Sequence, residues 1–260
     1  MFEPWDVVGI ARYERPVRDL NDRHCGTRAL SGTASLTDLG AFGAFFVGKV
    51  TRMQIDGPTL RPEVADELAE TWRHLGAPGT WWEGRQRTAL AEVARAARHG
   101  AAIPATDLGA AATEAAVTIA AHPARTTRAW VEEMVASIGE EPYVELVGVV
   151  TRVVVADTVA RLLGTEPAPF PPPRPGEPSR VAPEPRPRRI RTWVAIGNVL
   201  SPPRTLALVP DEKRRTNRLL QALYMTWADM EDPDFRRGEL HRTQIELVAA
   251  AVSYANECFY

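Results

Sequence analysis

The chain of 260 residues is predicted to be all-α: a helical bundle made of two related helical halves that a proline-rich connector joins. Three observations predict this class. Apolar residues recur at intervals of three and four along most of the chain after residue 60, which is the period of an amphipathic helix. Ten of the 22 prolines lie between residues 165 and 188. Two Glu-Leu-Val segments, 101 residues apart, indicate an internal repeat.

The composition divides the chain into four parts. Residues 1–60 mix glycine, aromatic and charged residues without a sustained period, and they remain unassigned. Residues 61–164 form the first helical half, residues 165–192 the connector, and residues 193–260 the second half. Proline lacks a backbone N–H and fixes its φ angle, so the connector is expected to be an extended, polyproline-like spacer. A motif for a proline-binding partner is the alternative that this stretch leaves open.

In the first half, the apolar spacing predicts five helices, at Leu60–Leu75, Trp81–Arg98, Thr106–Ala121, a fourth that Thr126 or Thr127 caps and that runs to Ile138, and Tyr143–Leu163. Pro62 suits a first helical turn, where its missing N–H costs nothing. The last segment is rich in valine, which also occurs in strands. Its length favours a buried helix, because strands rarely exceed about ten residues.

In the second half, the same reasoning predicts helices at Trp193–Ser201, Asp211–Trp227 and His241–Tyr254, with a loop at Met230–Gly238. The second of these begins with an acidic pair directly after Pro210, and negative side chains stabilise the positive end of a helix.

Composition and motifs exclude several classes of protein. The net charge of −2 argues against a nucleic-acid partner, because phosphate binding needs clustered positive charge. Two cysteines are too few for a secreted disulfide scaffold. We expect neither a membrane span nor a signal sequence, and therefore a cytoplasmic protein. Sequence motifs for nucleotide hydrolysis, zinc proteolysis or serine hydrolysis are absent, and no metal or cofactor is expected.

The internal repeat aligns Glu145–Arg152 with Glu246–Ser253. Carrying the same offset forward places Cys258 opposite Asp157. If Cys258 takes part in chemistry, the first copy has lost that thiol, and Glu145 is expected to be structural or a remnant.

The candidate catalytic residues are Cys258 and Glu246. They are twelve residues apart, which is about 18 Å along one straight helix, so they can meet only if the chain breaks between them. Asn256 is the expected break, because as an N-cap it would start a new helix with Cys258 at its second position. The helix dipole would stabilise a thiolate there, and Glu246 could accept its proton.

This end of the chain resembles the alkyl hydroperoxidase (AhpD-like) and carboxymuconolactone decarboxylase superfamily. The superfamily motif is a glutamate, eleven residues, Cys-x-x-Cys, and a histidine four residues later. Glu246, Asn256 and Cys258 match its first elements. The second cysteine and the histidine would fall at positions 261 and 265, so a fragment of a longer protein is expected.

The resemblance implies an AhpD-like fold and a thiol-dependent peroxidase. In that chemistry the downstream cysteine attacks a small hydroperoxide, and the upstream cysteine, which Cys258 matches, resolves the sulfenic acid into a disulfide. A thiol electron donor then restores the pair. The resemblance also implies a homo-oligomer, a trimer or hexamer. Two alternatives remain: a non-catalytic helical oligomerisation scaffold, and a decarboxylase-like enzyme of the same superfamily.

Overall fold

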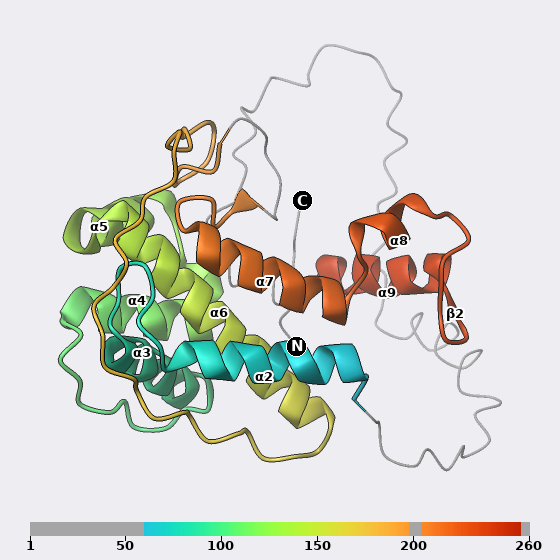
Figure 1. The fold of residues 1–260 in the computed structure, drawn as a ribbon, viewed down its shortest axis with the longest axis horizontal. Coiled ribbons are helices and arrows are strands. Elements are labelled where there is room, and N and C mark those ends of the chain that lie inside the picture. The colour runs from blue at the N-terminus through green and yellow to red at the C-terminus, as the bar shows by residue number, and fades with distance from the viewer. Residues whose placement is uncertain (1–59, 198–203, 256–260) are drawn as a thin grey trace, which may run out of the picture. The chain divides into compact units, whose positions relative to one another are not determined.

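The computed structural model describes residues 60–197 and 204–255, and all of them belong to one of the two compact units into which the chain divides. Most of this part is helical, which confirms the all-α class (Figure 1). The elements, in chain order, are α2 (Pro62–Leu75), α3 (Gly84–Arg98), α4 (Ala110–Ala121), the 3₁₀ turn η2 (Pro123–Arg125), α5 (Arg128–Ile138), α6 (Glu140–Leu162), α7 (Pro210–Leu223), α8 (Trp227–Glu231), β1 (Arg236–Arg237), β2 (Leu240–His241) and α9 (Arg242–Ala255). The two short strands pair antiparallel as a small hairpin that the sequence did not predict.

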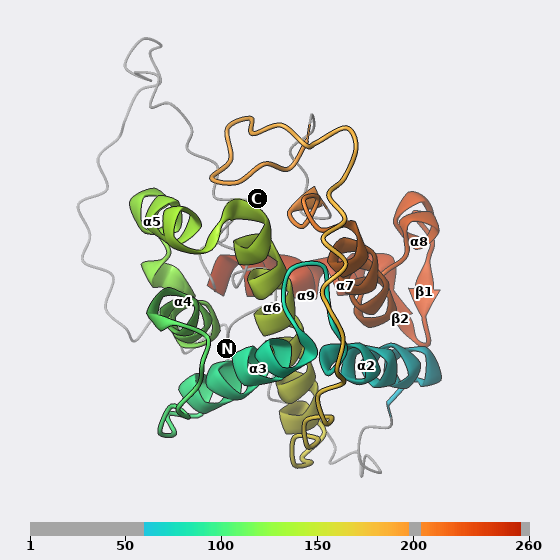
Figure 2. The ribbon, with the colours of Figure 1, turned by 60° about the vertical axis from the view of Figure 1, so that its left-hand side comes forward.

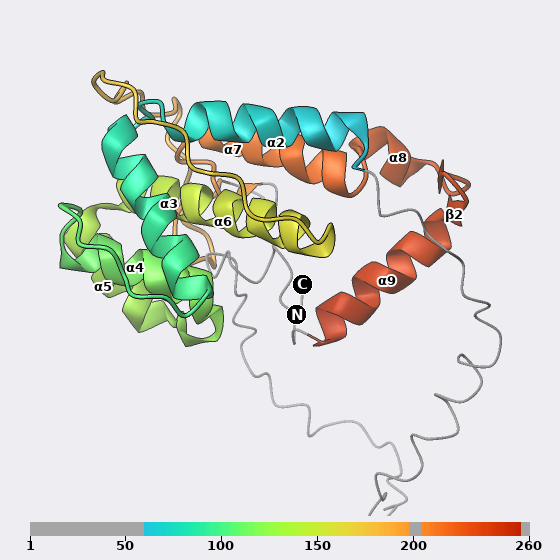
Figure 3. The ribbon, with the colours of Figure 1, turned by 90° about the horizontal axis from the view of Figure 1, so that it is seen from below.

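Helix α6 is the central element of the described bundle. It packs against α2, α3, α4, α5 and α7, and Figure 2 shows these helices arranged around it. Helices α2 and α7, which are far apart in the sequence, lie side by side (Figure 3). The first and second halves of the chain are therefore joined through α7, which contacts both α2 and α6.

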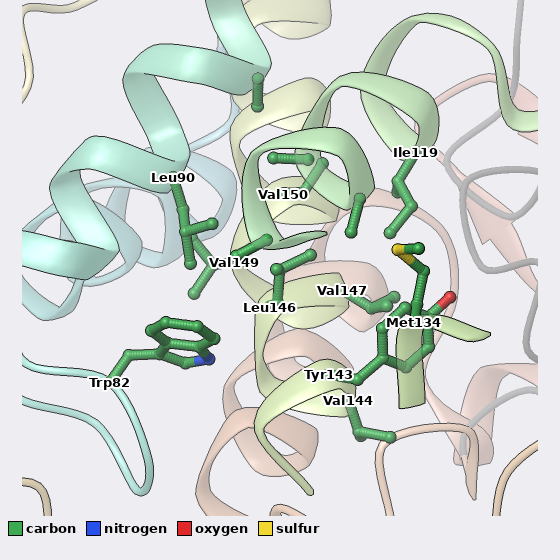
Figure 4. Packing of buried hydrophobic residues seen from close by; sticks show 14 of the residues in the cluster. Trp82, Leu90, Ile119, Met134, Tyr143, Val144, Leu146, Val147, Val149 and Val150 are labelled. Carbon is green, nitrogen blue, oxygen red and sulfur yellow. The ribbon is translucent and has the colours of Figure 1, made fainter. Parts of the chain in front are cut away.

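The valine-rich segment is a helix, as its length predicted, because neighbouring helices bury its side chains. Tyr143, Leu146 and Val150 are each 1% exposed or less. Figure 4 shows Leu146 and Val149 facing Leu90 of α3 on one side of the core, with Ile119, Met134 and Tyr143 on the other. Burying one such side chain stabilises the fold by roughly 1.5–3 kcal/mol. A helix that is apolar on all sides is typical of a core position.

The starts of two helices differ from the predicted ones. Helix α3 begins at Gly84 rather than Trp81, because the Glu83 and Gln86 side chains form a capping box around that start. Helix α4 begins at Ala110 rather than Thr106, with Gly109 before it. Of the two threonines predicted to cap α5, Thr127 does so, since its hydroxyl accepts a hydrogen bond from the Trp130 amide at 3.2 Å.

The helix predicted at Trp193–Ser201 is wrong over its described residues, 193–197, of which the first two form a bend and the other three have no regular secondary structure. Trp193, Val194 and Ile196 are buried in the core, so the apolar pattern reports burial and not helical spacing. The amide of Ala195 donates to Glu140 Oε1 at 3.0 Å, which satisfies the backbone without a helix. The helix predicted at Asp211–Trp227 ends at Leu223, and Thr226 caps the separate short helix α8, which extends from Trp227 to Glu231 and so enters the predicted loop at Met230–Gly238.

The connector is extended, as predicted, and it is also docked along the first half. The Trp72 indole N–H donates to the Pro169 carbonyl at 2.9 Å, and the Arg174 amide donates to the Gly76 carbonyl at 2.7 Å. Phe170 stacks on Trp72 with ring centroids 6.0 Å apart, and the Arg95 guanidinium lies 3.7 Å from the centre of the Phe170 ring. These contacts hold the connector to α2 and α3, so it does more than separate the two halves.

Replacing Phe170 with alanine should loosen the connector, because it removes both the stacking on Trp72 and the cation–π contact with Arg95. We expect a loss of about 1–2 kcal/mol in the free energy of unfolding. Trypsin should also cut faster at the exposed connector arginines. Val181→Ala is the matched control, because Val181 lies in the same segment and is 66% exposed. Equal cleavage rates in the two variants would show that Phe170 does not anchor the connector.

Candidate functional site

Glu246 lies in the first half of α9, and its side chain is 45% exposed. Both of its carboxylate oxygens have partners. The Tyr224 hydroxyl donates to Oε2 at 2.7 Å, and Arg242, one turn earlier on α9, places Nε 3.6 Å from Oε1. Tyr224 follows directly after the last residue of α7. The sequence-predicted carboxylate is therefore held between the end of one helix and the first turn of another.

The predicted partner thiol, Cys258, and the predicted break at Asn256 lie outside the described residues. Helix α9 runs unbroken from Arg242 to Ala255, the last described residue. The meeting of Glu246 with Cys258 stays a prediction. Proximity of the two groups would give the thiol a proton acceptor.

The two acids that the predicted repeat aligns with Glu246 and Cys258 both lie among the described residues. Asp157, the residue aligned with Cys258, accepts two hydrogen bonds from Arg95 of α3, Nε to Oδ2 and Nη2 to Oδ1, each at 2.8 Å. Glu145, the residue aligned with Glu246, pairs with Arg87 of the same helix α3. Both aligned acids thus form ion pairs between α3 and α6. This supports the prediction that Glu145 is structural.

Glu145 belongs to a group of five side chains that we call the buried ionic cluster: His74 of α2, Arg87 of α3, Glu145 and Arg152 of α6, and Glu212 of α7. Four of the five are at most 2% exposed, and the His74 side chain is 11% exposed. Arg87 Nη1 lies 2.8 Å from Glu212 Oε1, and Arg152 pairs with the same carboxylate. His74 Nε2 lies 3.1 Å from Glu212 Oε1. The cluster therefore joins four helices through one carboxylate.

The loop between α2 and α3 closes over this cluster. The amide of Trp81 donates to Glu145 Oε2 at 2.5 Å. A side chain on Gly79 would collide with the Glu145 carboxylate and with the Arg87 guanidinium, so only glycine fits there. The outer edge of the loop receives the connector, because the Ser179 and Arg180 amides donate to the carbonyls of Gly79 and Thr80 at 3.0 and 2.9 Å.

The two carboxylates of the cluster have different electrostatic surroundings. Burial raises the pKa of Glu145, and Arg87 opposes this shift only in part. Burial also acts on Glu212, but Arg152 and Arg87 outweigh it and hold the pKa of Glu212 well below 4.5. Burial lowers the pKa of His74, so this imidazole is neutral at pH 7. Ion pairs of this kind stabilise a fold only when both partners are present, because a single buried charge is costly.

The guanidinium groups of the cluster are not fully satisfied. Nε and Nη2 of Arg87 and Nε and Nη1 of Arg152 are buried and form no hydrogen bond with other described residues. Unpaired buried donors usually bind ordered water.

Within the described part of the chain, no group of three or more histidine, cysteine, aspartate or glutamate side chains could hold a metal ion. There too, none of the helices has the length and apolar character needed to cross a membrane.

Reasoning from the sequence missed most of these partners. Charged residues inside the apolar segment Tyr143–Leu163 were one signal, because Glu145 and Arg152 are seven residues apart and share a helix face. Glu212 was assigned to a favourable position at a helix end, yet it is 1% exposed and paired. No sequence feature identified Arg87 or Tyr224 as a site residue, because their partners lie on segments far away in the sequence.

The depressed pKa of Glu212 predicts a pH dependence of stability. A carboxyl group whose pKa is lower in the folded state stabilises the fold above its unfolded pKa, and this contribution is lost as the pH falls through its folded pKa. Glu212→Gln should therefore cost about 3–5 kcal/mol at pH 7. It should also flatten the loss of stability as the pH falls below about 5, measured by denaturant unfolding.

Glu177→Gln serves as the control for Glu212→Gln, because Glu177 is exposed and has no hydrogen bond or ion pair with other described residues. This variant should keep the wild-type stability and pH slope. A Glu212→Gln protein with an unchanged slope would show that Glu212 does not make this contribution.

Comparison with protein families, with curated proteins and with solved structures found no match for the chain. Its assignment therefore depends on the residues and the geometry described above.

Proposed function

We propose that the protein takes part in thiol-dependent reduction of hydroperoxides, with Cys258 as a redox-active thiol and Glu246 as its proton acceptor. The observation that carries the proposal is the state of Glu246. It is the one acid of the aligned pair Glu145 and Glu246 that is half exposed and held by a hydroxyl, whereas Glu145 is sealed in an ion pair. The Glu246 carboxylate is accessible to a neighbouring thiol, whereas Arg87 and the Trp81 amide enclose the carboxylate of Glu145.

The chemistry needs two thiols. A first thiolate attacks the O–O bond of the hydroperoxide, so its sulfur is oxidised to sulfenic acid and the peroxide is reduced to an alcohol. The thiolate of Cys258 then attacks the sulfenic sulfur, a disulfide bond forms, and the oxygen leaves as water after it takes up a proton. Two equivalents of an external thiol donor reduce that disulfide and leave as their own disulfide. In this series of reaction steps, Glu246 takes the proton from the Cys258 thiol.

One observation favours the alternative of a non-catalytic oligomerisation scaffold. Leu247, Val248 and Tyr254 of α9 are 64–88% exposed, and exposed apolar side chains in a group are typical of association surfaces. A scaffold requires neither a reactive thiol nor a proton acceptor beside it. The reactivity of Cys258 therefore distinguishes the two functions.

The test uses the chain with Cys25→Ser, so that Cys258 is the single thiol. The rate of disulfide exchange with 5,5′-dithiobis(2-nitrobenzoate) is measured against pH. Glu246→Gln should slow exchange at pH 7 by about tenfold, because the proton acceptor is lost. Cys258→Ser should abolish exchange.

Glu239→Gln is the matched control, since Glu239 lies between β1 and β2 and is exposed, and the substitution removes the same charge. The Glu239→Gln protein should react as the parent does. The proposal is contradicted if Cys258 exchanges at the rate of an ordinary thiol, equally in the parent and in Glu246→Gln.

A further inference from the structure

The first helical half binds the connector chiefly through the connector's main chain. The indole N–H of Trp72 donates to the Pro169 carbonyl at 2.9 Å, and Nη1 of Arg95 donates to the Ala168 carbonyl at 3.0 Å. Further along, three connector amides donate at 2.7–3.0 Å to carbonyls of the segment between α2 and α3. Figure 2 shows the connector crossing this segment. Contacts of this kind are typical of a surface that binds an extended peptide.

Phe170 is the aromatic anchor of the connector. Its ring stacks on Trp72 with centroids 6.0 Å apart, and the Arg95 guanidinium lies 3.7 Å from the ring centre. Arg95 is itself held by two hydrogen bonds to Asp157 of α6, so the groups that receive Phe170 are fixed within the first half. Near the other end of the docked stretch, Pro178 is buried.

Glycine allows the connector backbone to approach the first half closely. A side chain on Gly76 would place its first carbon 2.7 Å from the Pro172 carbonyl oxygen, which is a collision. The φ angle of Gly76 is −78°, which any residue adopts, so the backbone itself does not require glycine at this position. The surface is therefore shaped to receive main chain at this point.

The connector also has the composition of a peptide ligand. Seven of the twelve residues from 167 to 178 are proline. Proline fixes φ and favours an extended chain, so such a segment loses little conformational entropy when it binds. Aromatic surfaces bind proline-rich segments in other proteins for the same reason.

We propose that Trp72, Arg95 and residues 76–80 form a binding surface for a proline-rich peptide, and that connector residues 168–180 are the ligand that this surface holds within the same chain. A tethered ligand competes with a free peptide at an effective concentration on the order of millimolar. The surface therefore accepts a free peptide only after the connector is released. This inference depends on neither Cys258 nor Glu246.

The test adds a free copy of the ligand to the full chain. A fluorescein-labelled peptide of residues 166–182 is titrated with protein, and binding is measured by fluorescence anisotropy. The released chain carries Phe170→Ala and Ser179→Pro, which remove the aromatic anchor and one amide donor. It should bind the peptide about tenfold more tightly than the wild-type chain, whose connector fills the surface. Val181→Ala is the matched control, because it keeps the anchor and the donor, and it should bind as weakly as the wild type.

Two further changes show whether the peptide occupies the proposed surface. A peptide with Phe170→Ala should bind the released chain about tenfold more weakly, because the stacking and cation–π contacts are lost. Adding Gly76→Ala to the released chain should also weaken binding about tenfold, since the three atoms nearest to the new methyl group all belong to the connector.

Equal binding of the peptide to the released and wild-type chains would overturn the inference, as would equal binding of a peptide with the same composition in scrambled order. Far-ultraviolet circular dichroism shows whether each variant keeps its helices. If the released chain does not fold, Gly76→Ala alone decides. It should displace the connector, so that trypsin cuts after Arg180 faster than in the wild type, and an unchanged rate would overturn the inference.

Discussion

The ion pair between Arg87 and Glu145 is the interaction on which the described structure depends. It joins α3 to the central helix α6, and the same guanidinium reaches Glu212 of α7. A buried pair gains little over apolar residues of equal size, but removing one partner is costly, so the pair fixes the geometry around it. The loop that covers it, with Gly79 against the carboxylate, then receives the connector. One buried contact thereby determines where three helices and two irregular segments lie.

The acids that the predicted repeat aligns have different partners. Glu145 and Asp157 pair with two arginines of α3, and Arg95 in turn contacts Phe170 of the connector. These two acids thus hold the bundle and the connector together. Glu246 has a hydroxyl and a more distant guanidinium as its partners. Thiol chemistry is therefore proposed for the Glu246 end of the chain.

Much of the fold could be predicted from the sequence, and most of the site could not. The apolar period located the long helices, because the residues that form the buried face of a helix recur at regular intervals within one short segment. The prediction from this period failed at Trp193–Gly197. There the Glu140 carboxylate of α6 accepts a hydrogen bond from the Ala195 amide, and the apolar residues pack without a helix. The motif spacing identified Glu246, because the spacing between residues can be recognised in one sequence. Tyr224, the partner of Glu246, comes from a segment that packing brings close, as Arg87 does for Glu145. No local sequence pattern indicates contacts of this kind.

The central claim, that Arg87 and Glu145 act as one unit, is tested most directly by a double-mutant cycle of unfolding free energies. The variants are Arg87→Met, Glu145→Met and the two together. The account predicts that each single change costs about 3–5 kcal/mol, because Arg87→Met leaves the Glu145 carboxylate without a cation and Glu145→Met leaves Arg87 with Glu212 as its one carboxylate. The double variant should cost less than the sum of the singles by about 2 kcal/mol, within the range measured for residues in contact. Additive costs, equal to the sum within about 0.5 kcal/mol, would contradict the account.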